Sequence, residues 1–306
     1  MYLQAGYLMR GRDVPGYERA QELLQTAIAI DPHFTAAWLR LGEVYAQGTG
    51  IGMFETEEAL AGARHAANRA FELEPDNAYV YKLLAFIAQI LEADIATARR
   101  EITRALQLRP NDAEIVGHAA FIYARMGRLD EAKLLYDRAS RLDPVSADGL
   151  YGLGLGMLAV GRIDDAEAAF RKALQLTPEG AGFHQRLAWV HLLRGDYQEA
   201  LSSAAKERED GRRTSVRALI FQAMGESEQA IAEHEKLIAA GERWTYEIAR
   251  MYAFRNLPDE AFEWLERAYA RADSSLWFVS WDPFLDNIRG DPRFASVEDR
   301  LYINQD

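Results

Sequence analysis

The chain has 306 residues, a formal net charge of −12 and a sequence pI near 5.1, and it contains no cysteine. The acidic balance argues against a nucleic-acid partner, because affinity for phosphate backbones comes mostly from clustered Lys and Arg, and it favours basic or apolar partners instead. The absence of cysteine excludes disulfides and thiolate metal sites. No apolar run reaches about eighteen residues and no signal peptide is visible, so we expect a cytoplasmic protein with no membrane partner.

Proline recurs at a nearly fixed step along the chain, each time after an Ala-rich helical segment. Pro75, Pro110, Pro144 and Pro178 are 35, 34 and 34 residues apart, and Pro32 lies 43 residues before Pro75. Such a period predicts a helical repeat array, in which each helix pair buries its apolar face only against a neighbour. We therefore expect one elongated all-α domain, a right-handed superhelical solenoid of antiparallel helix pairs.

The repeat units can be followed from the N-terminus. The first has a short, poorly marked helix within Tyr2–Arg12, and the second carries an insertion between its helices that explains the longer proline step. After Ala204 the charged stretch Lys206–Ser215 should end a helix early, and two shorter units follow. The units that the spacing predicts are residues 1–32, 33–75 with an insertion at 47–60, 76–110, 111–144, 145–178, 179–210, 211–241 and 242–273, with a C-terminal cap at 274–306.

The unit at 111–144 shows the pattern in full. An Asn111–Asp112 cap opens the first helix, Gly127 suits the left-handed turn after it, and Ala132, Tyr136 and Ala139 form one stripe of the second helix. Small residues let two antiparallel helices approach closely while aromatic side chains fill the space beside them. This order of residues resembles the tetratricopeptide repeat.

The end of the chain lacks the repeat spacing. Asp291–Pro292 should start a short capping helix whose apolar face contains Phe294, Val297 and Leu301. The aromatic cluster before it has two interpretations: it seals the last repeat, which is the simpler one, or it forms a docking patch. The cluster consists of Trp277, Phe278, Trp281 and Phe284.

Beyond the repeats, nearly the whole chain resembles the C-terminal repeat region of bacterial signalling proteins that carry a nucleotide-cyclase or winged-helix DNA-binding domain upstream. The resemblance rests on YLQAGYL at Tyr2–Leu8, on Gly16–Trp38 and on WDPFLDNIRGDPRFASV at Trp281–Val297. It implies a non-catalytic regulatory or protein-binding module. Because the chain begins at the array, the resemblance gives no basis for cyclase or DNA-binding activity here.

One stripe of the first helices should line a concave groove for a peptide or protein partner. Aromatic and Arg side chains dominate binding sites of this kind. The alternative is that narrow curvature buries the stripe against itself. The predicted groove residues are Tyr79, Lys82, Phe86, Phe121, Arg125, Tyr151, Leu155, Trp189 and Leu192.

Other motifs favour packing or turns over chemistry. The glycines at 48–52 lack the Lys-Ser or Lys-Thr of a phosphate-binding loop, and Gly152, Gly154 and Gly156 lie within a predicted first helix. His184 and His191 occupy packing positions, and the six histidines show no metal-ligand spacing. We therefore expect no cofactor, no metal and no catalytic residues.

The sequence thus predicts a non-enzymatic scaffold that binds an apolar or basic protein or peptide in its groove, with self-association left open. The alternative is a regulatory or oligomerisation fragment of a larger bacterial signalling protein whose N-terminal cyclase or DNA-binding domain is absent from this chain.

Overall fold

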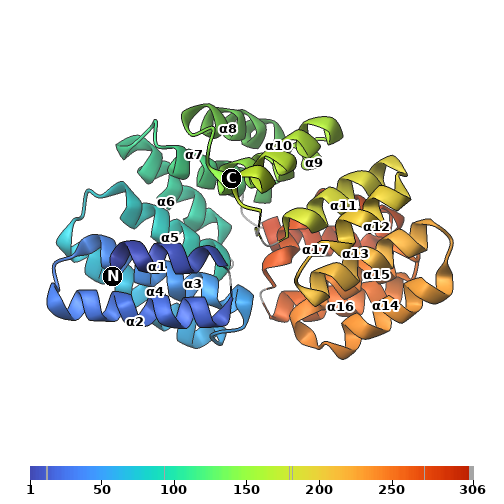
Figure 1. Ribbon diagram of the computed structural model, residues 1–306, viewed down its shortest axis with the longest axis horizontal. Helices are drawn as coiled ribbons and strands as arrows, with labels where there is room; N and C mark the ends of the chain where they lie inside the picture. The colour runs from blue at the N-terminus through green and yellow to red at the C-terminus, as the bar shows by residue number, and fades with distance from the viewer. Residues whose placement is uncertain (12, 93, 179, 181, 272, 303–306) are drawn as a thin grey trace. The chain divides into compact units, whose positions relative to one another are not determined.

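The computed structural model describes residues 1–11, 13–92, 94–178, 180, 182–271 and 273–302. Every regular element among them is a helix, as expected from the sequence (Figure 1). By their contacts the residues form two compact units: Met1–Tyr123 with Leu134–Asp143, called unit 1 below, and Ala124–Lys133 with Pro144–Asp306, called unit 2. Each unit is described by itself.

Unit 1 is built from helix pairs that pack side by side, α1 on α2, α3 on α4 and α5 on α6. Neighbouring pairs join because α3 also packs on α2 and α5. Gly42 of α3 shows why a small residue is needed, since a Cβ there would lie 2.6 Å from Leu83 Cδ2 of α5. The helices are α1 Tyr2–Leu8, α2 Val14–Ile30, α3 Thr35–Gly48, α4 Thr56–Leu73, α5 Ala78–Ile90, α6 Ile95–Leu108, α7 Ala113–Arg125 and α8 Leu129–Leu142, and the last two each contribute residues to both units.

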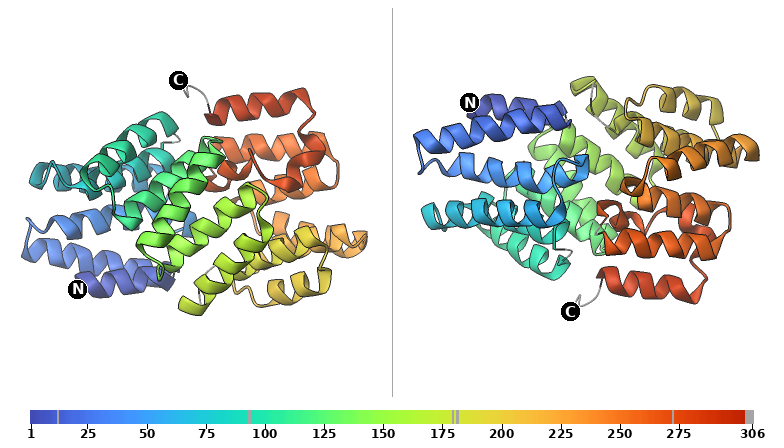
Figure 2. Two further views of the ribbon diagram at one scale, coloured as in Figure 1. Left: turned by 90° about the horizontal axis from the view of Figure 1, so that it is seen from above. Right: turned by 90° about the horizontal axis from the view of Figure 1, so that it is seen from below.

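Unit 2 repeats the scheme in the pairs α9 with α10, α11 with α12, α13 with α14 and α15 with α16. The first helices also pack on one another, α11 on α13 and α13 on α15 (Figure 2). Gly154 of α9 faces Phe170 of α10, where a Cβ would lie 2.5 Å from the ring. The helices are α9 Ala147–Ala159, α10 Ile163–Leu176, α11 Phe183–Arg194, α12 Tyr197–Ala205, α13 Asp210–Ala223, α14 Ser227–Ala239, α15 Thr245–Phe254 and α16 Pro258–Ala270.

The helix ends confirm the sequence signals. The second helices α2, α4, α6, α8 and α10 each end two residues before a proline of the periodic set. Proline disfavours the helical conformation of the residue before it and cannot continue a helix, which fixes these joints. Gly127 and Gly195 have φ values of 70° and 82° and form the expected left-handed turns. The charged stretch after Ala204 ends α12 early, as predicted.

Two short 3₁₀ helices follow α16, η4 Ser274–Phe278 and η5 Pro283–Ile288. We call Ser274–Ile288 the closing segment; its two helices lie against α15. Helix α17, Pro292–Tyr302, then caps α16, because Arg293 pairs with Asp259 at 2.8 Å and Arg300 pairs with Glu266. Phe294 and Val297 are buried as expected, whereas the side chains of Leu301 and Trp277 lie outside the described part of the chain.

Candidate protein-interaction site

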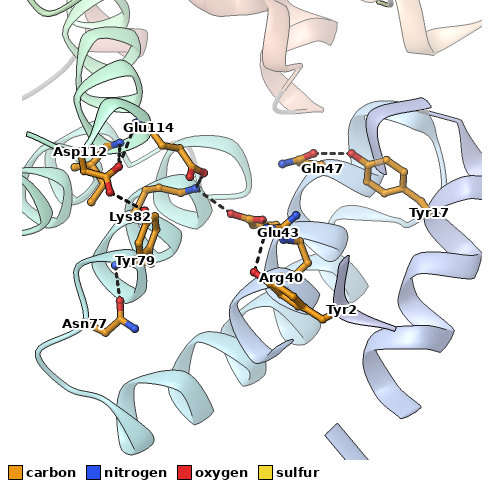
Figure 3. Close-up of polar contacts among 11 residues, drawn as sticks. Tyr2, Tyr17, Arg40, Glu43, Gln47, Asn77, Tyr79, Lys82, Asp112 and Glu114 are labelled. Atoms are coloured by element: carbon orange, nitrogen blue, oxygen red, sulfur yellow. Dashed lines mark hydrogen bonds and ion pairs between the residues drawn. The ribbon is translucent and has the colours of Figure 1, made fainter. Parts of the chain in front are cut away.

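The face of each first helix that points away from its second helix differs between the two units; we call it the first-helix face. In unit 1 this face carries a continuous set of polar contacts that crosses α1, α3, α5 and α7 (Figure 3). Arg40 donates to the hydroxyl oxygen of Tyr2 at 3.2 Å, its Nε lies 3.3 Å from Glu43, and Lys82 Nζ lies 2.9 Å from Glu43. Lys82 also pairs with Glu114. We call these five residues the charged ladder.

Lys82 holds the centre of the charged ladder. Its side chain is buried, at 8% exposure, between carboxylates that come from α3 and α7. Burial by itself lowers the pKa of the ammonium, but Glu43 and Glu114 outweigh that effect and raise the pKa above its usual value. Lys82 therefore links three first helices as a permanent cation. The expectation that it lies open in a groove is wrong: both carboxylates already engage it.

Tyr79 stands beside the charged ladder with its ring partly exposed. Its hydroxyl donates to Asp112 at 2.6 Å, and its backbone N–H donates to Asn77 Oδ1 at 2.9 Å. Burial first, and then the carboxylate of Asp112, raise the pKa of Tyr79 to about 12. The hydroxyl therefore stays protonated, and the ring is held in one place on the surface.

Two further aromatic residues continue this face, and both are partly exposed. Phe86 of α5 meets the His118 ring of α7 edge-on at 5.7 Å, and Phe121 lies one turn further along α7. His118 Nε2 lies 2.9 Å from Gln89 Oε1, and burial, together with the charge of Lys82, lowers the pKa of His118 to about 3. The imidazole is therefore neutral at physiological pH. Tyr79, Phe86 and Phe121 of the predicted set are thus partly exposed residues of unit 1.

In unit 2 the corresponding face is covered by the closing segment. Trp189 of α11 is 1% exposed and meets the rings of Phe278 and Phe284 at 5.8 and 5.6 Å. Leu155 and Leu192 are buried as well, at 4% and 6% exposure. The expectation that these three side chains are open to a partner is wrong. For Trp189 the reason is clear, because the chain itself fills the space that a partner was expected to take.

The remaining two predicted residues have other surroundings. Tyr151 of α9 stacks on Phe183 at 5.0 Å, and its hydroxyl accepts a hydrogen bond from Arg186 Nε at 3.1 Å. Arg125 is a partly buried residue at the end of α7 that groups with unit 2. Neither residue belongs to the face formed by Tyr79, Phe86 and Phe121.

A buried ion pair anchors the closing segment. Arg250 of α15 is 1% exposed and Asp282 is 0% exposed, with Nε and Oδ2 2.8 Å apart. Tyr246 donates to the same carboxylate oxygen at 2.9 Å, and its pKa is raised well above the usual value, by burial first and then by Asp282. A charged pair so far from water depends on close contact between both members.

Sequence reasoning did not select Arg250, Tyr246 or Asp282. A signal was present, because Arg250 stands eleven residues before Ala261, as Trp189 stands eleven before Ala200. The count that placed Trp189 on the first-helix face therefore places Arg250 there too.

The other sequence motifs lie in ordinary structural places. The glycines at 48–52 end α3 and form the short 3₁₀ turn η2, Thr49–Ile51. No three His, Asp or Glu side chains of the described residues gather in a way that could hold a metal ion. Within the ranges that the structure describes, no helix is both long and apolar enough to cross a membrane.

Two family models match the chain, both described as tetratricopeptide repeat, over residues 89–151 and 151–212. The chain carries tetratricopeptide repeats. Together with the stacked helix pairs, this tetratricopeptide repeat architecture is that of a protein–protein interaction scaffold.

Among curated proteins, the chain is similar to the transcriptional regulator HilA of Salmonella paratyphi A, with 22% identity over 190 residues, which is 62% of this chain. It spans only 28% of that relative's length. Among solved structures, one chain of the APC/C hetero-tetramer Cut9–Hcn1 is similar, with TM-score 0.64 and 15% identity. The match covers 97% of this chain and 54% of that chain. A chain of the human IFIT1 dimer with PPP-AAAA is also similar, with TM-score 0.61 and 20% identity. This match covers 84% of this chain and 69% of the IFIT1 chain. At these identities the structures show the shared fold alone.

Proposed function

We propose that this protein is a non-catalytic scaffold that binds a peptide or protein segment on the first-helix face of unit 1. The observation that carries the proposal is the combination of three partly exposed aromatic side chains, Tyr79, Phe86 and Phe121, with the charged ladder beside them. Aromatic side chains contribute most to binding when their position is already fixed, and the hydrogen bond to Asp112 fixes Tyr79.

The partner segment is proposed to be apolar or basic. The net charge of −12 favours encounter with cations and opposes an acidic ligand or a nucleic acid. Among the residues that form ion pairs in the charged ladder, Glu114 has the most exposed side chain, at 61%. A basic group of the partner can therefore reach its carboxylate. Our proposal keeps the cytoplasmic location expected from the sequence and includes no cofactor.

Site-specific photo-crosslinking tests this proposal. A photoreactive phenylalanine analogue is placed at Phe86 on the proposed face or, as the matched control, at Phe71 on α4, which is 42% exposed and lies on a second helix. We expect a discrete crosslinked partner from the Phe86 position and none from Phe71. Adding Glu114→Gln should weaken the Phe86 adduct if the partner is basic, because the exposed carboxylate is lost.

Two results would contradict the proposal: equal adducts from both positions, or an adduct from Phe71 alone. An adduct consisting of nucleic acid would contradict the expected partner class while leaving the face in use. An adduct consisting of a second copy of the chain would assign the face to self-association.

A second candidate function is supported by the similarity to HilA. The chain would then be the regulatory or oligomerisation part of a longer regulator whose output lies on a domain outside these residues. Sequencing the native reading frame tests this: a further domain fused upstream of Met1 supports it, and a start codon at Met1 opposes it. A regulator would also change its output when Phe86 and Tyr79 are replaced in the complete protein.

A further inference from the structure

The closing segment sits on unit 2 as a bound peptide would. It has no repeat spacing, and its two 3₁₀ helices flank Val279–Asp282. Phe278 and Phe284 place their rings on Trp189. Asp282 reaches Arg250, and Asn287 donates to the backbone carbonyl oxygen of Phe254 at 3.0 Å. Every one of these contacts goes to α11 or α15, which are both first helices of unit 2.

The covered face has more hydrogen-bond donors than the closing segment uses. The guanidinium groups of Arg186 and Arg250 lie 4.2 and 4.3 Å from the Trp189 ring. Arg186 Nη1, Arg250 Nη1 and Trp189 Nε1 are buried and have no hydrogen-bond partner among the described residues. Asp282 pairs with Arg250, whose charge is also balanced by the Glu247 carboxylate on the same helix, and Arg186 donates its Nε to Tyr151. Buried donors without acceptors weaken a contact, so the closing segment holds this face less tightly than its ring contacts and its ion pair alone suggest.

We propose that the first-helix face of α11 and α15 is a second binding site, which recognises a short segment with a carboxylate between aromatic side chains. The closing segment, with Trp281-Asp282-Pro283-Phe284, occupies this site within the same chain. The external ligand is a partner protein's segment of the same aromatic–Asp–Pro–aromatic kind, which displaces the closing segment. This site is separate in chemistry and place from the proposed face of unit 1, which favours basic segments.

The closing segment competes with a free peptide for the same face, and this competition determines the peptide affinity that can be measured. A segment tethered to its own site has an effective concentration on the order of millimolar, so a free peptide competes poorly with it. Weakening the tethered segment should therefore strengthen binding of the free peptide. If the segment is instead an inseparable part of the fold, replacing Asp282 destabilises unit 2 as a whole, and no folded face is left to bind the free peptide.

Fluorescence polarisation with the full-length chain tests the proposal. The probe is a labelled peptide with the sequence of residues 274–290. We expect the Asp282→Asn chain to bind it at least about ten-fold more tightly than wild type, because one partner of a buried charge pair is lost from the tethered segment. The matched control is Asp286→Asn, in the same segment with a side chain that is 66% exposed, and it should bind as wild type does.

A receptor-side variant completes the test. The double variant Arg250→Gln with Asp282→Asn leaves no unpaired buried charge, but it lacks the cation that binds the peptide's carboxylate. It should therefore lose the tighter peptide binding expected of Asp282→Asn alone. The peptide with Asn at position 282 should likewise bind Asp282→Asn at least about ten-fold more weakly than the original peptide. Circular dichroism confirms that each chain is folded.

Should Asp282→Asn fail to fold, a protease site inserted after Arg271 of the full chain gives the second measurement. After cleavage, the closing segment should exchange with labelled peptide faster than the protein unfolds. Exchange no faster than unfolding would overturn the proposal, as would equal peptide binding by wild type and a folded Asp282→Asn. Concentration-dependent dimers of Asp282→Asn that block the peptide would assign the face to a second copy and also overturn it. None of these results depends on crosslinking at Phe86.

Discussion

The same structural position has two different uses in the two units. In unit 1 the first-helix face presents ion pairs and partly exposed rings, and Lys82 joins neighbouring helices through Glu43 and Glu114. In unit 2 the equivalent face holds Trp189 and Arg250, and the closing segment covers both. A repeat match therefore identifies which residues face away from the second helices. It does not tell what lies against them.

The two faces should also differ in what their charges contribute. The outer carboxylate of the charged ladder, Glu114, is 61% exposed, so water solvates it when its partner is lost. Arg250 and Asp282 have almost no contact with water, so either one left alone is an uncompensated buried charge. Variants that disturb the buried pair of unit 2 should therefore lose more stability than variants that disturb the charged ladder of unit 1.

The variant Arg250→Met should cause the largest loss of stability. It leaves the Asp282 carboxylate buried without its cation, so we expect a loss of about 3–5 kcal/mol in the free energy of unfolding. Denaturant unfolding followed by tryptophan fluorescence measures it. The control is Arg267→Met, which removes an arginine whose side chain is 47% exposed and which pairs with Glu263. A loss no larger than the control's would show that the pair is not buried as described.

Acid titration probes a buried histidine in the interior of unit 2. His234 is 2% exposed against the Tyr252 ring at 4.5 Å, and burial, helped by Arg255, lowers its pKa to about 4. The unfolded chain, with a histidine pKa near 6.5, binds this proton first, so stability falls as the pH falls from about 6.5 toward 4. Between pH 7 and 5 we expect His234 to account for a loss of about 2 kcal/mol.

The check is a His234→Phe variant, which cannot titrate at this position. Its free energy of unfolding should fall less than that of wild type over the same pH range. Parallel pH dependence in the two chains would show that His234 is protonated equally well in the folded state.

The smallest effect is expected in unit 1. Lys82→Met removes the centre of the charged ladder, but Glu114 is exposed and Glu43 keeps its contact with Arg40. We expect a loss of about 1 kcal/mol that shrinks further at high salt, since partly exposed ion pairs are screened. Thermal unfolding at low and high salt measures it. A loss as large as that of Arg250→Met would remove the distinction between the two faces.

Much of the fold could be predicted from local sequence signals. Pro75, Pro110 and Pro178 stop helices by their own chemistry, and Gly195 marks a turn through its positive φ. The helix positions follow from these residues because each helix pair is short and contacts its neighbours in chain order.

The site could be predicted only in part. Tyr79, Phe86 and Phe121 are partly exposed on first helices of unit 1, and their positions follow from the repeat count; that they bind a partner stays a prediction. The burial of Trp189 depends on a segment about ninety residues later in the chain, and no periodicity connects the two. The pairing of Arg250 with Asp282 is of the same long-range kind, although the cluster around Trp281 pointed to the segment involved.

Hydroxyl-radical footprinting of the full chain reports the exposure of aromatic side chains in both units at once, so it can distinguish the open face of unit 1 from the covered face of unit 2. We expect oxidation of Tyr79 and Phe86 in unit 1 and protection of Trp189 and Tyr246 in unit 2. Oxidation of Trp189 and Tyr246 at rates equal to those of Tyr79 and Phe86 would contradict this expectation, since the closing segment would then not cover its face in solution.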